Sequence, residues 1–116
     1  MTVESTIYSV VGALCASRVY PDVAPTGTAR PYVVYQQVGG QVLNPIDGSA
    51  PGDRHARVQV NVWAATRIAA TTLMQQIEDA MRPAPAHGRP VGALIARYDE
   101  HSELRGAQQD FTFWHT

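Results

Sequence analysis

The chain has 116 residues, of which 45% are hydrophobic and 16% are charged, and its nine basic and ten acidic side chains give a net charge of −1. This length suits a single domain over residues 1–116, and the hydrophobic share is that of a folded protein rather than a disordered one. The near-zero net charge argues against a general electrostatic attraction to nucleic acid or to anionic membranes.

The chain contains one cysteine, Cys15, so no disulfide can form within it. Because Cys15 falls on an amphipathic pattern, we expect it to be a small buried apolar group. No apolar run reaches the ~18 residues that a membrane span needs, and no basic segment followed by an apolar one opens the chain. We therefore expect a cytosolic protein that does not contact membranes.

The first helix is expected over residues 2–16, with Thr2 as its N-cap. Its apolar stripe consists of Val3, Ile7, Val10, Val11 and Leu14. Three prolines then predict an extended excursion over residues 18–31, because proline restricts both itself and the residue before it. Within this excursion, Val19 and Tyr20 are expected to form a short edge strand.

Two strands follow, and a long loop separates them. Residues 32–38 are rich in β-branched and aromatic side chains, and residues 55–63 alternate strictly between apolar and polar. The two faces of the second strand are Val58, Val60 and Val62 on one side and Arg57, Gln59, Asn61 and Trp63 on the other. We expect the valine face to lie on the core. The loop over residues 39–53 has a length typical of functional or disordered segments.

A second helix is expected from its N-cap Thr66 to about Arg82. Its inner stripe would have Gln76 as the one polar member and consist of Ile68, Ala69, Leu73, Gln76, Ile77, Ala80 and Met81. Two further strands are predicted over residues 91–98 and 107–114, joined by a polar hairpin turn. The order of elements predicts a single α+β domain. Its sheet would be largely antiparallel and four-stranded, with both helices packed on one face and the long loop between the first two main strands.

The chain shows no catalytic, cofactor or metal signature. Its four histidines have no partners at metal-ligand spacing, and the acidic run over residues 99–103 is expected to be a solvated turn. A nucleophile elbow and a glycine-rich phosphate loop are both absent from the sequence. We therefore predict that the protein is not an enzyme and binds no cofactor.

Two features on the polar side of the clearest strand leave alternatives open. Arg54 and Arg57 lie beside His55, either as part of a solvated strand face or as a contact between subunits or with a channel. Sequence-specific reading of DNA has the least support. Trp63 and Trp114 both end strands on the side opposite the aliphatic one. Each is either covered by packing or exposed as an anchor for a partner.

Four segments, in their order along the chain, resemble one known family. They are Arg18-Val19-Tyr20-Pro21-Asp22, Pro31-Tyr32-Val33-Val34-Tyr35, Arg57-Val58-Gln59-Val60-Asn61-Val62-Trp63-Ala64 and Asp110-Phe111-Thr112-Phe113-Trp114-His115. Their order and spacing, together with the two helices, resemble the small tail-completion (tail-terminator) proteins of long-tailed bacteriophages and prophages, of the head–tail joining type. The resemblance covers most of the chain.

The resemblance implies a structural protein that caps the tail tube, ends its polymerisation and provides the surface that joins tail to head. Such proteins form rings, typically hexameric, with a central channel for DNA. The implied partners are further copies of the chain, the major tail tube protein and a head–tail connector protein. The implied location is the bacterial host cytoplasm during assembly and then the neck of the virion.

From the loop and the strand after it we select eight candidate residues for an assembly interface. They are Gln41, Val42, Leu43, Asn44, Arg54, Arg57, Gln59 and Trp63. Val42 and Leu43 are apolar in an otherwise polar loop, which fits a segment that becomes ordered in a complex. Two other classes remain open, namely another neck component, such as a head-closure or connector protein, and a small ligand-binding domain or enzyme.

Overall fold

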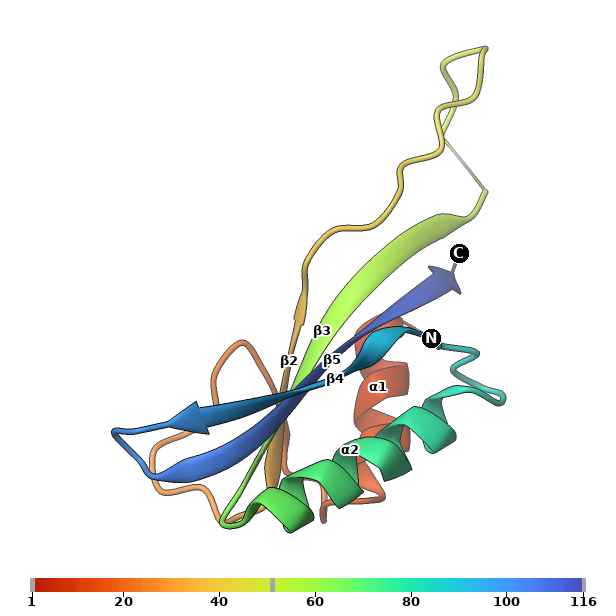
Figure 1. Cartoon of the computed structure of the whole chain (residues 1–116). Helices are drawn as coiled ribbons and strands as arrows, with labels where there is room; N and C mark the ends of the chain where they lie inside the picture. Colours follow the sequence, from red (N-terminus) through yellow and green to blue (C-terminus); the bar gives the residue numbers. More distant parts are fainter. Residues whose placement is uncertain (1, 51, 116) are drawn as a thin grey trace.

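The computed structural model describes residues 2–50 and 52–115, so Pro51 of the expected loop lies outside the described residues. Its helices are α1 (Val3–Gly12) and α2 (Arg67–Met81). Its strands are β1 (Val19–Pro21), β2 (Tyr32–Gln37), β3 (Arg54–Ala64), β4 (Arg89–Asp99) and β5 (Leu104–His115). Figure 1 shows these elements as one body, from which the segment between β2 and β3 projects far beyond the sheet.

The strands form one sheet in the order β1-β2-β3-β5-β4. The pairs β2–β3, β3–β5 and β4–β5 are antiparallel, whereas β1 runs parallel to β2. The α+β class is therefore confirmed, with five strands instead of the four main ones expected. The fifth is the short edge strand anticipated near Val19. It is parallel because the excursion before β2 returns the chain in the same direction.

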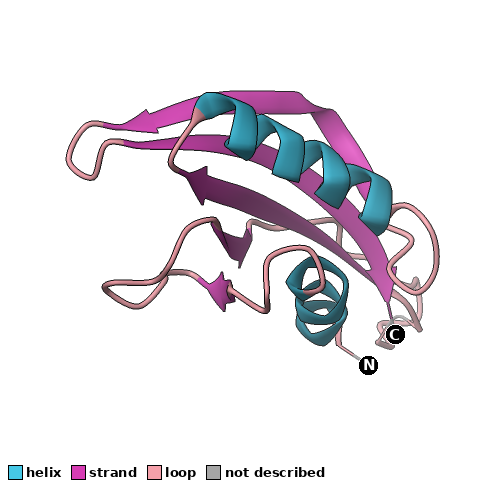
Figure 2. Cartoon of the chain, turned by 90° about the horizontal axis from the view of Figure 1, so that it is seen from below, coloured by secondary structure: helices cyan, strands magenta, loops and turns pink. Residues whose placement is uncertain are grey.

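The core lies between the helices and one face of the sheet, as Figure 2 shows from below. The alternation predicted for β3 is confirmed, because Val58, Val60 and Val62 are at most 2% exposed. Phe111 and Phe113 of β5 continue this face and are also buried. Each fully buried aliphatic side chain stabilises the fold by about 1.5–3 kcal/mol, so this face accounts for much of the stability.

Both helices begin at the expected N-caps. The Thr2 side chain accepts a hydrogen bond from the Ser5 N–H, and the Thr66 side chain accepts one from the Ala69 N–H. However, α1 ends at Gly12 rather than at residue 16, and turns carry the chain from there to β1. Cys15 lies in these turns and is buried, as expected.

The inner stripe predicted for α2 was partly wrong. Gln76 is exposed, as are Ile68 and Ala69, whereas Ala70 and Met74 are fully buried beside Leu73 and Ile77. The helix is therefore rotated relative to the stripe expected from its first turn. The buried polar residue that faces α2 is instead Gln109 of β5. Its amide donates hydrogen bonds to Glu78 of α2 and to the Gly92 carbonyl in the bulge of β4.

Replacement of Phe111 tests which face of β5 seals the core. Phe111→Ala should lower the free energy of unfolding by about 3–5 kcal/mol, because it leaves a cavity beneath the helices. The matched change Thr112→Ala, on the opposite face of the same strand, should cost less than about 1 kcal/mol. Urea denaturation measures both. Equal losses would show that the face assignment is incorrect.

Candidate assembly interface

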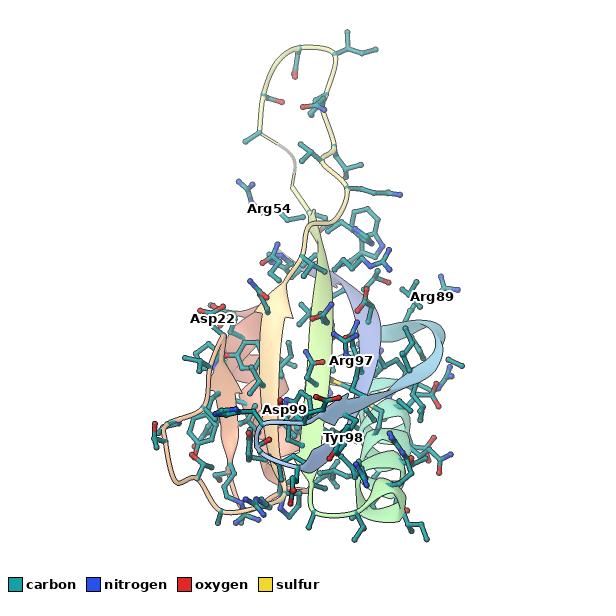
Figure 3. All side chains as sticks on the ribbon, turned by 60° about the vertical axis from the view of Figure 1, so that its left-hand side comes forward. Asp22, Arg54, Arg89, Arg97, Tyr98 and Asp99 are labelled. Atoms are coloured by element: carbon teal, nitrogen blue, oxygen red, sulfur yellow. The ribbon has the colours of Figure 1, made fainter. Side chains whose placement is uncertain are left out.

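One face of the sheet carries no helix, and we call it the open face. Cross-strand partners share a face, so the register assigns its members. They are Tyr32, Val34 and Gln36 of β2; Arg57, Gln59, Asn61 and Trp63 of β3; Gly106, Gln108, Asp110 and Thr112 of β5; and Arg89, Val91, Ile95 and Arg97 of β4. Figure 3 looks onto this face, with Arg97 lying over it.

An ion pair lies in the middle of the open face. The Arg57 guanidinium donates a hydrogen bond of 2.8 Å to Asp110, whose side chain is 16% exposed. Beside it, the Asn61 amide donates to the Gln59 side chain at 3.2 Å. The centre of the face is thus polar, with the positive charge of Arg57 balanced by a carboxylate, although the buried side-chain oxygen of the neighbouring Gln108 has no hydrogen-bond partner among the described residues.

The end of the open face that lies near the β4–β5 turn is more apolar. Trp63 is partly buried and lies over Gly106, where an added Cβ would come within 2.8 Å of the indole. Leu104 is buried at the same end, beneath the excursion that precedes β2. A hollow of about 330 Å³ opens between this excursion and Arg97, with Trp63, Tyr32 and Asn61 among its lining residues. For Trp63, the interpretation in which packing covers the indole therefore holds in part.

At the other end, the chain leaves the sheet as a long projection, residues 38–53, which we call the arm (Figure 1). Every described residue of the arm is exposed, including Val42 at 78%, Leu43 at 42% and Ile46 at 108%. Single exposed apolar residues are normal, but three within five positions of a projecting segment are typical of a surface that another molecule covers.

The base of the arm is fixed to β3. The Val38 N–H donates to the Arg57 carbonyl, and the Arg57 N–H donates to the Gly39 carbonyl. Gly40 follows with φ +143°, and a Cβ there would collide with the His55 carbonyl oxygen, so this position needs glycine. The Gln41 N–H then donates to His55 Nδ1 at 2.9 Å. The arm therefore begins from a defined anchor.

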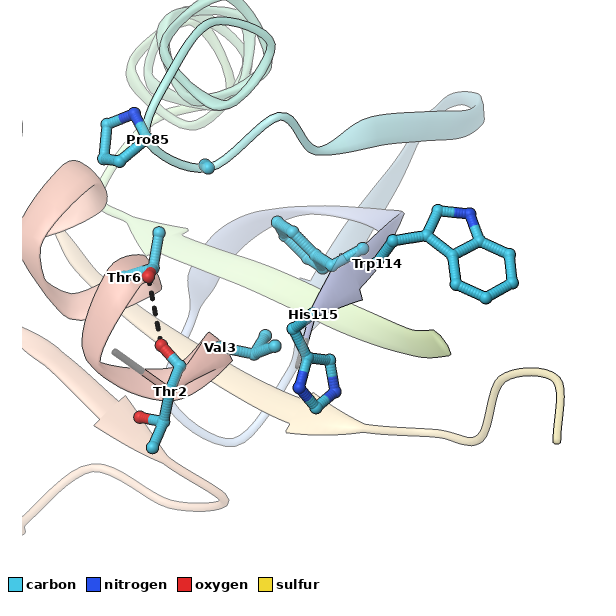
Figure 4. A pocket seen from close by; sticks show the side chains of 8 residues that line it. Thr2, Val3, Thr6, Pro85, Trp114 and His115 are labelled. Carbon is cyan, nitrogen blue, oxygen red and sulfur yellow. Dashed lines mark hydrogen bonds between the residues drawn. The ribbon is translucent and has the colours of Figure 1, made fainter. Parts of the chain in front are cut away.

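His55 is held from its other side by Trp114, with ring centroids 4.6 Å apart. Trp114 is 52% exposed, and in Figure 4 its indole points away from the hollow at the helix N-terminus. Of the two interpretations offered for Trp114, the structure therefore favours the one in which the indole is exposed.

Farther out on the arm, hydrogen bonds from the Ser49 side chain and backbone hold the pKa of Asp47 below its usual value, so this carboxylate stays charged at neutral pH.

The geometry offers little for chemistry. Across residues 2–50 and 52–115, no three histidine, cysteine or acidic side chains lie close enough together to hold a metal ion. Burial raises the pKa of the Cys15 thiol, which disfavours the reactive thiolate. None of the described helices combines the length and apolar character that a membrane crossing requires.

The eight candidate residues fall into two neighbouring groups. Arg57, Gln59 and Trp63 form a line along the open face, whereas the other five lie on the arm or at its base. They are Gln41, Val42, Leu43, Asn44 and Arg54. The selection missed Asp110, which pairs with Arg57, and Ile46, the most exposed apolar residue of the arm. Alternation of the last strand could have placed Asp110 on the polar face, but its register with β3 could not be read from the chain.

Comparison with solved structures identifies the class of protein that has this fold. A chain from the virion of a native gene transfer agent particle matches with a TM-score of 0.59 and 22% identity, covering 91% of this chain and 84% of the other. The gp17 protein of bacteriophage SPP1 matches with a TM-score of 0.55 and 13% identity, covering 98% and 88%. The fold is thus one found in phage and phage-like particles.

The family follows from the sequence itself. The model of the family described as tail completion protein gp17 matches residues 5–116, so the chain belongs to this family of structural phage proteins. The expected resemblance is confirmed over nearly the whole chain. A comparison with curated protein sequences gave no match.

Replacement of His55 tests the anchor of the arm. In His55→Phe the ring that stacks on Trp114 is kept, but the acceptor for the Gln41 N–H is lost. One hydrogen bond of about 0.5–1.5 kcal/mol corresponds to roughly two- to tenfold faster exchange of the Gln41 amide. NMR-detected hydrogen exchange measures this rate. His87→Phe, away from the arm, is the control, and an unchanged Gln41 amide in His55→Phe would contradict the anchor.

Proposed function

We propose that the protein caps the phage tail tube, ends its polymerisation and forms the surface to which the head is joined. The observation that carries this proposal is the match to the tail completion family over residues 5–116. We further propose that it acts as a ring of identical subunits, hexameric as the family resemblance implies. It would assemble in the bacterial host cytoplasm and remain at the neck of the virion.

The shape of the molecule supports this role. A terminator has to bind the last ring of the tube with one surface and present a different surface to the next component. Here the helices cover one sheet face, while the arm is exposed and the open face carries no helix (Figures 1 and 2). A ring also requires two different complementary patches on each subunit, and these uncovered surfaces can provide them.

The arm is the part that we assign to contact with the tube or a neighbouring subunit. Its three exposed apolar side chains are Val42, Leu43 and Ile46. Because Val42 is 78% exposed and Leu43 only 42%, burial of what they still expose would stabilise a complex by about 2–4 kcal/mol, before subtraction of the entropy lost when the arm becomes ordered. The eight candidate interface residues extend this surface onto the open face.

The charge of the protein fits a channel through which DNA passes. The net charge of −1 provides no strong attraction to phosphates, so a ring of such subunits would release DNA rather than hold it. We therefore assign no sequence-specific contact with nucleic acid. The partners are the major tail tube protein on one side and a head–tail connector protein on the other.

Polymerisation of the tube protein tests the proposal. Addition of the chain to polymerising tail tube protein should halt growth and give short tubes with a cap, measured as length distributions by negative-stain electron microscopy. The double substitution Val42→Ser/Leu43→Ser should raise the concentration needed by ~30-fold or more, because about 2 kcal/mol of burial or more is lost.

The matched control is Ile68→Ser, which removes an apolar side chain that is 79% exposed on α2, away from the arm. It should stop tube growth as the unmodified protein does. Circular dichroism and the melting temperature check that each variant is folded. If the unmodified chain leaves tube lengths unchanged but binds the head connector, the protein is a head-side neck component instead.

A further inference from the structure

The edge strand β4 has an outer side that is exposed. β4 ends the sheet order, so one side of its backbone has no partner strand among the described residues. Its exposed apolar side chains are Val91 at 37%, Ile95 at 55% and Tyr98 at 47%. Such an edge readily accepts another strand unless it carries protective features.

The proline and the bulge of β4 lie in its first half, whereas in the second half the Arg97 carbonyl accepts a hydrogen bond of 3.2 Å from the Arg67 guanidinium. Pro90 removes a backbone donor, and the irregularity between Val91 and Ile95, with Gly92 at φ +72°, interrupts the ladder. From Ile95 to Asp99 the strand pairs regularly with β5 and carries neither proline nor bulge. This second half is therefore a regular strand edge, with Ile95 and Arg97 on the open face and Tyr98, whose ring packs against the Arg105 guanidinium at 4.0 Å, on the other.

The arm has the complementary properties. Val42, Leu43 and Asn44 make no backbone-to-backbone hydrogen bond with any described residue, and the Val42 carbonyl accepts a long bond of 3.4 Å from the Asn44 side chain, so most of this backbone can pair with another strand. The arm provides three exposed apolar side chains and the ionised carboxylate of Asp47. The second half of β4 provides two exposed apolar side chains and the guanidinium of Arg97.

These two surfaces lie at opposite ends of one molecule. The arm leaves the sheet where Arg54 pairs with His115, whereas Asp99 pairs with Leu104 at the other end of β5. Eleven residues of strand separate these two points, which is roughly 37 Å at ~3.4 Å per residue. The arm also projects away from the β4–β5 turn (Figure 1). It therefore cannot reach that edge within the same chain.

We infer that the arm of one subunit adds as a strand to the second half of β4, from Ile95 to Asp99, of the next subunit. Each chain would donate an arm at one end and receive one at the other. This is a heterologous contact, which repeats around a closed ring or along an open filament. The inference deepens the proposed ring and rests on that proposed function for its setting at the tube end.

Mixed cysteine variants test this contact. Protein carrying Leu43→Cys is mixed with protein carrying Ile95→Cys, Ala96→Cys or Arg97→Cys. Each of the three mixtures is assembled at tube ends and oxidised. At least one mixture should give a disulfide-linked dimer that neither variant gives alone, because only docking brings the two cysteines together. Cys15 is buried and can stay in place. The control partner is Asp79→Cys on the exposed side of α2, which should give no dimer.

A charge variant gives a second, independent measurement. Ile95→Glu places a charge where the apolar side chains of the arm would be buried, and should weaken self-association ~tenfold or more in analytical ultracentrifugation or at tube ends, because the carboxylate would leave water without a partner. The control Ile68→Glu replaces an exposed isoleucine of α2 by the same charged side chain and should leave self-association unchanged. Melting temperatures check the folding of both variants.

The outcomes separate this inference from the proposed function. Tubes that are capped without any arm–β4 disulfide would overturn the inference and leave the capping role standing. Arm–β4 disulfides in protein that never caps tubes would support the inference and overturn the capping role. No disulfide in any mixture, together with equal association of the two glutamate variants, would overturn the inference whatever the tubes show.

Discussion

Burial of the valine face of β3 against the two helices is the interaction on which the rest of the structure depends. Val58, Val60 and Val62 are at most 2% exposed, and Phe111 of β5 extends the same surface. Because successive side chains of a strand point to opposite faces, burying these residues turns Arg57, Gln59, Asn61 and Trp63 outward. A shift of register by one residue would exchange the two faces, so the same contact fixes both the core and the open face.

The open face and the arm are direct consequences of this arrangement. Both helices lie on one side of the sheet, so no described helix covers the polar centre around Arg57 and Asp110. The arm begins at a fixed anchor, where the Gln41 N–H meets His55, and then extends with Val42 and Ile46 exposed. A small domain that seals one face and projects such a segment is suited to contacts with other chains rather than to chemistry.

Much of the fold could be read from the chain, because its signals are local. The strict alternation around Val60 predicted β3, and the caps Thr2 and Thr66 predicted where both helices begin. The inner stripe predicted for α2 was partly wrong, because the apolar residues of this helix outline two overlapping stripes. Only packing against the sheet selects the stripe that includes Ala70 and Met74. The parallel pairing of β1 depends on a contact across the excursion, which no local pattern reveals.

The candidate interface was accessible from the sequence only in part. Val42 and Leu43 were conspicuous as apolar residues in a polar loop, and the structure leaves both exposed. The Arg57–Asp110 pair joins residues 53 positions apart, and the exposed edge of β4 follows from the strand order, so neither could be predicted. Long-range register decides both, and the periodicity of a single strand carries no information about its neighbour.

We infer that the arm, the open face and the β4 edge, rather than the helices, contact other molecules. Hydrogen–deuterium exchange of the free protein and of protein bound at tube ends can distinguish these surfaces. We expect protection on binding to be gained in the arm and at strand edges, while the amides of α1 and α2 are unchanged. Protection gained mainly in α1 and α2, with the arm still exchanging freely, would contradict it.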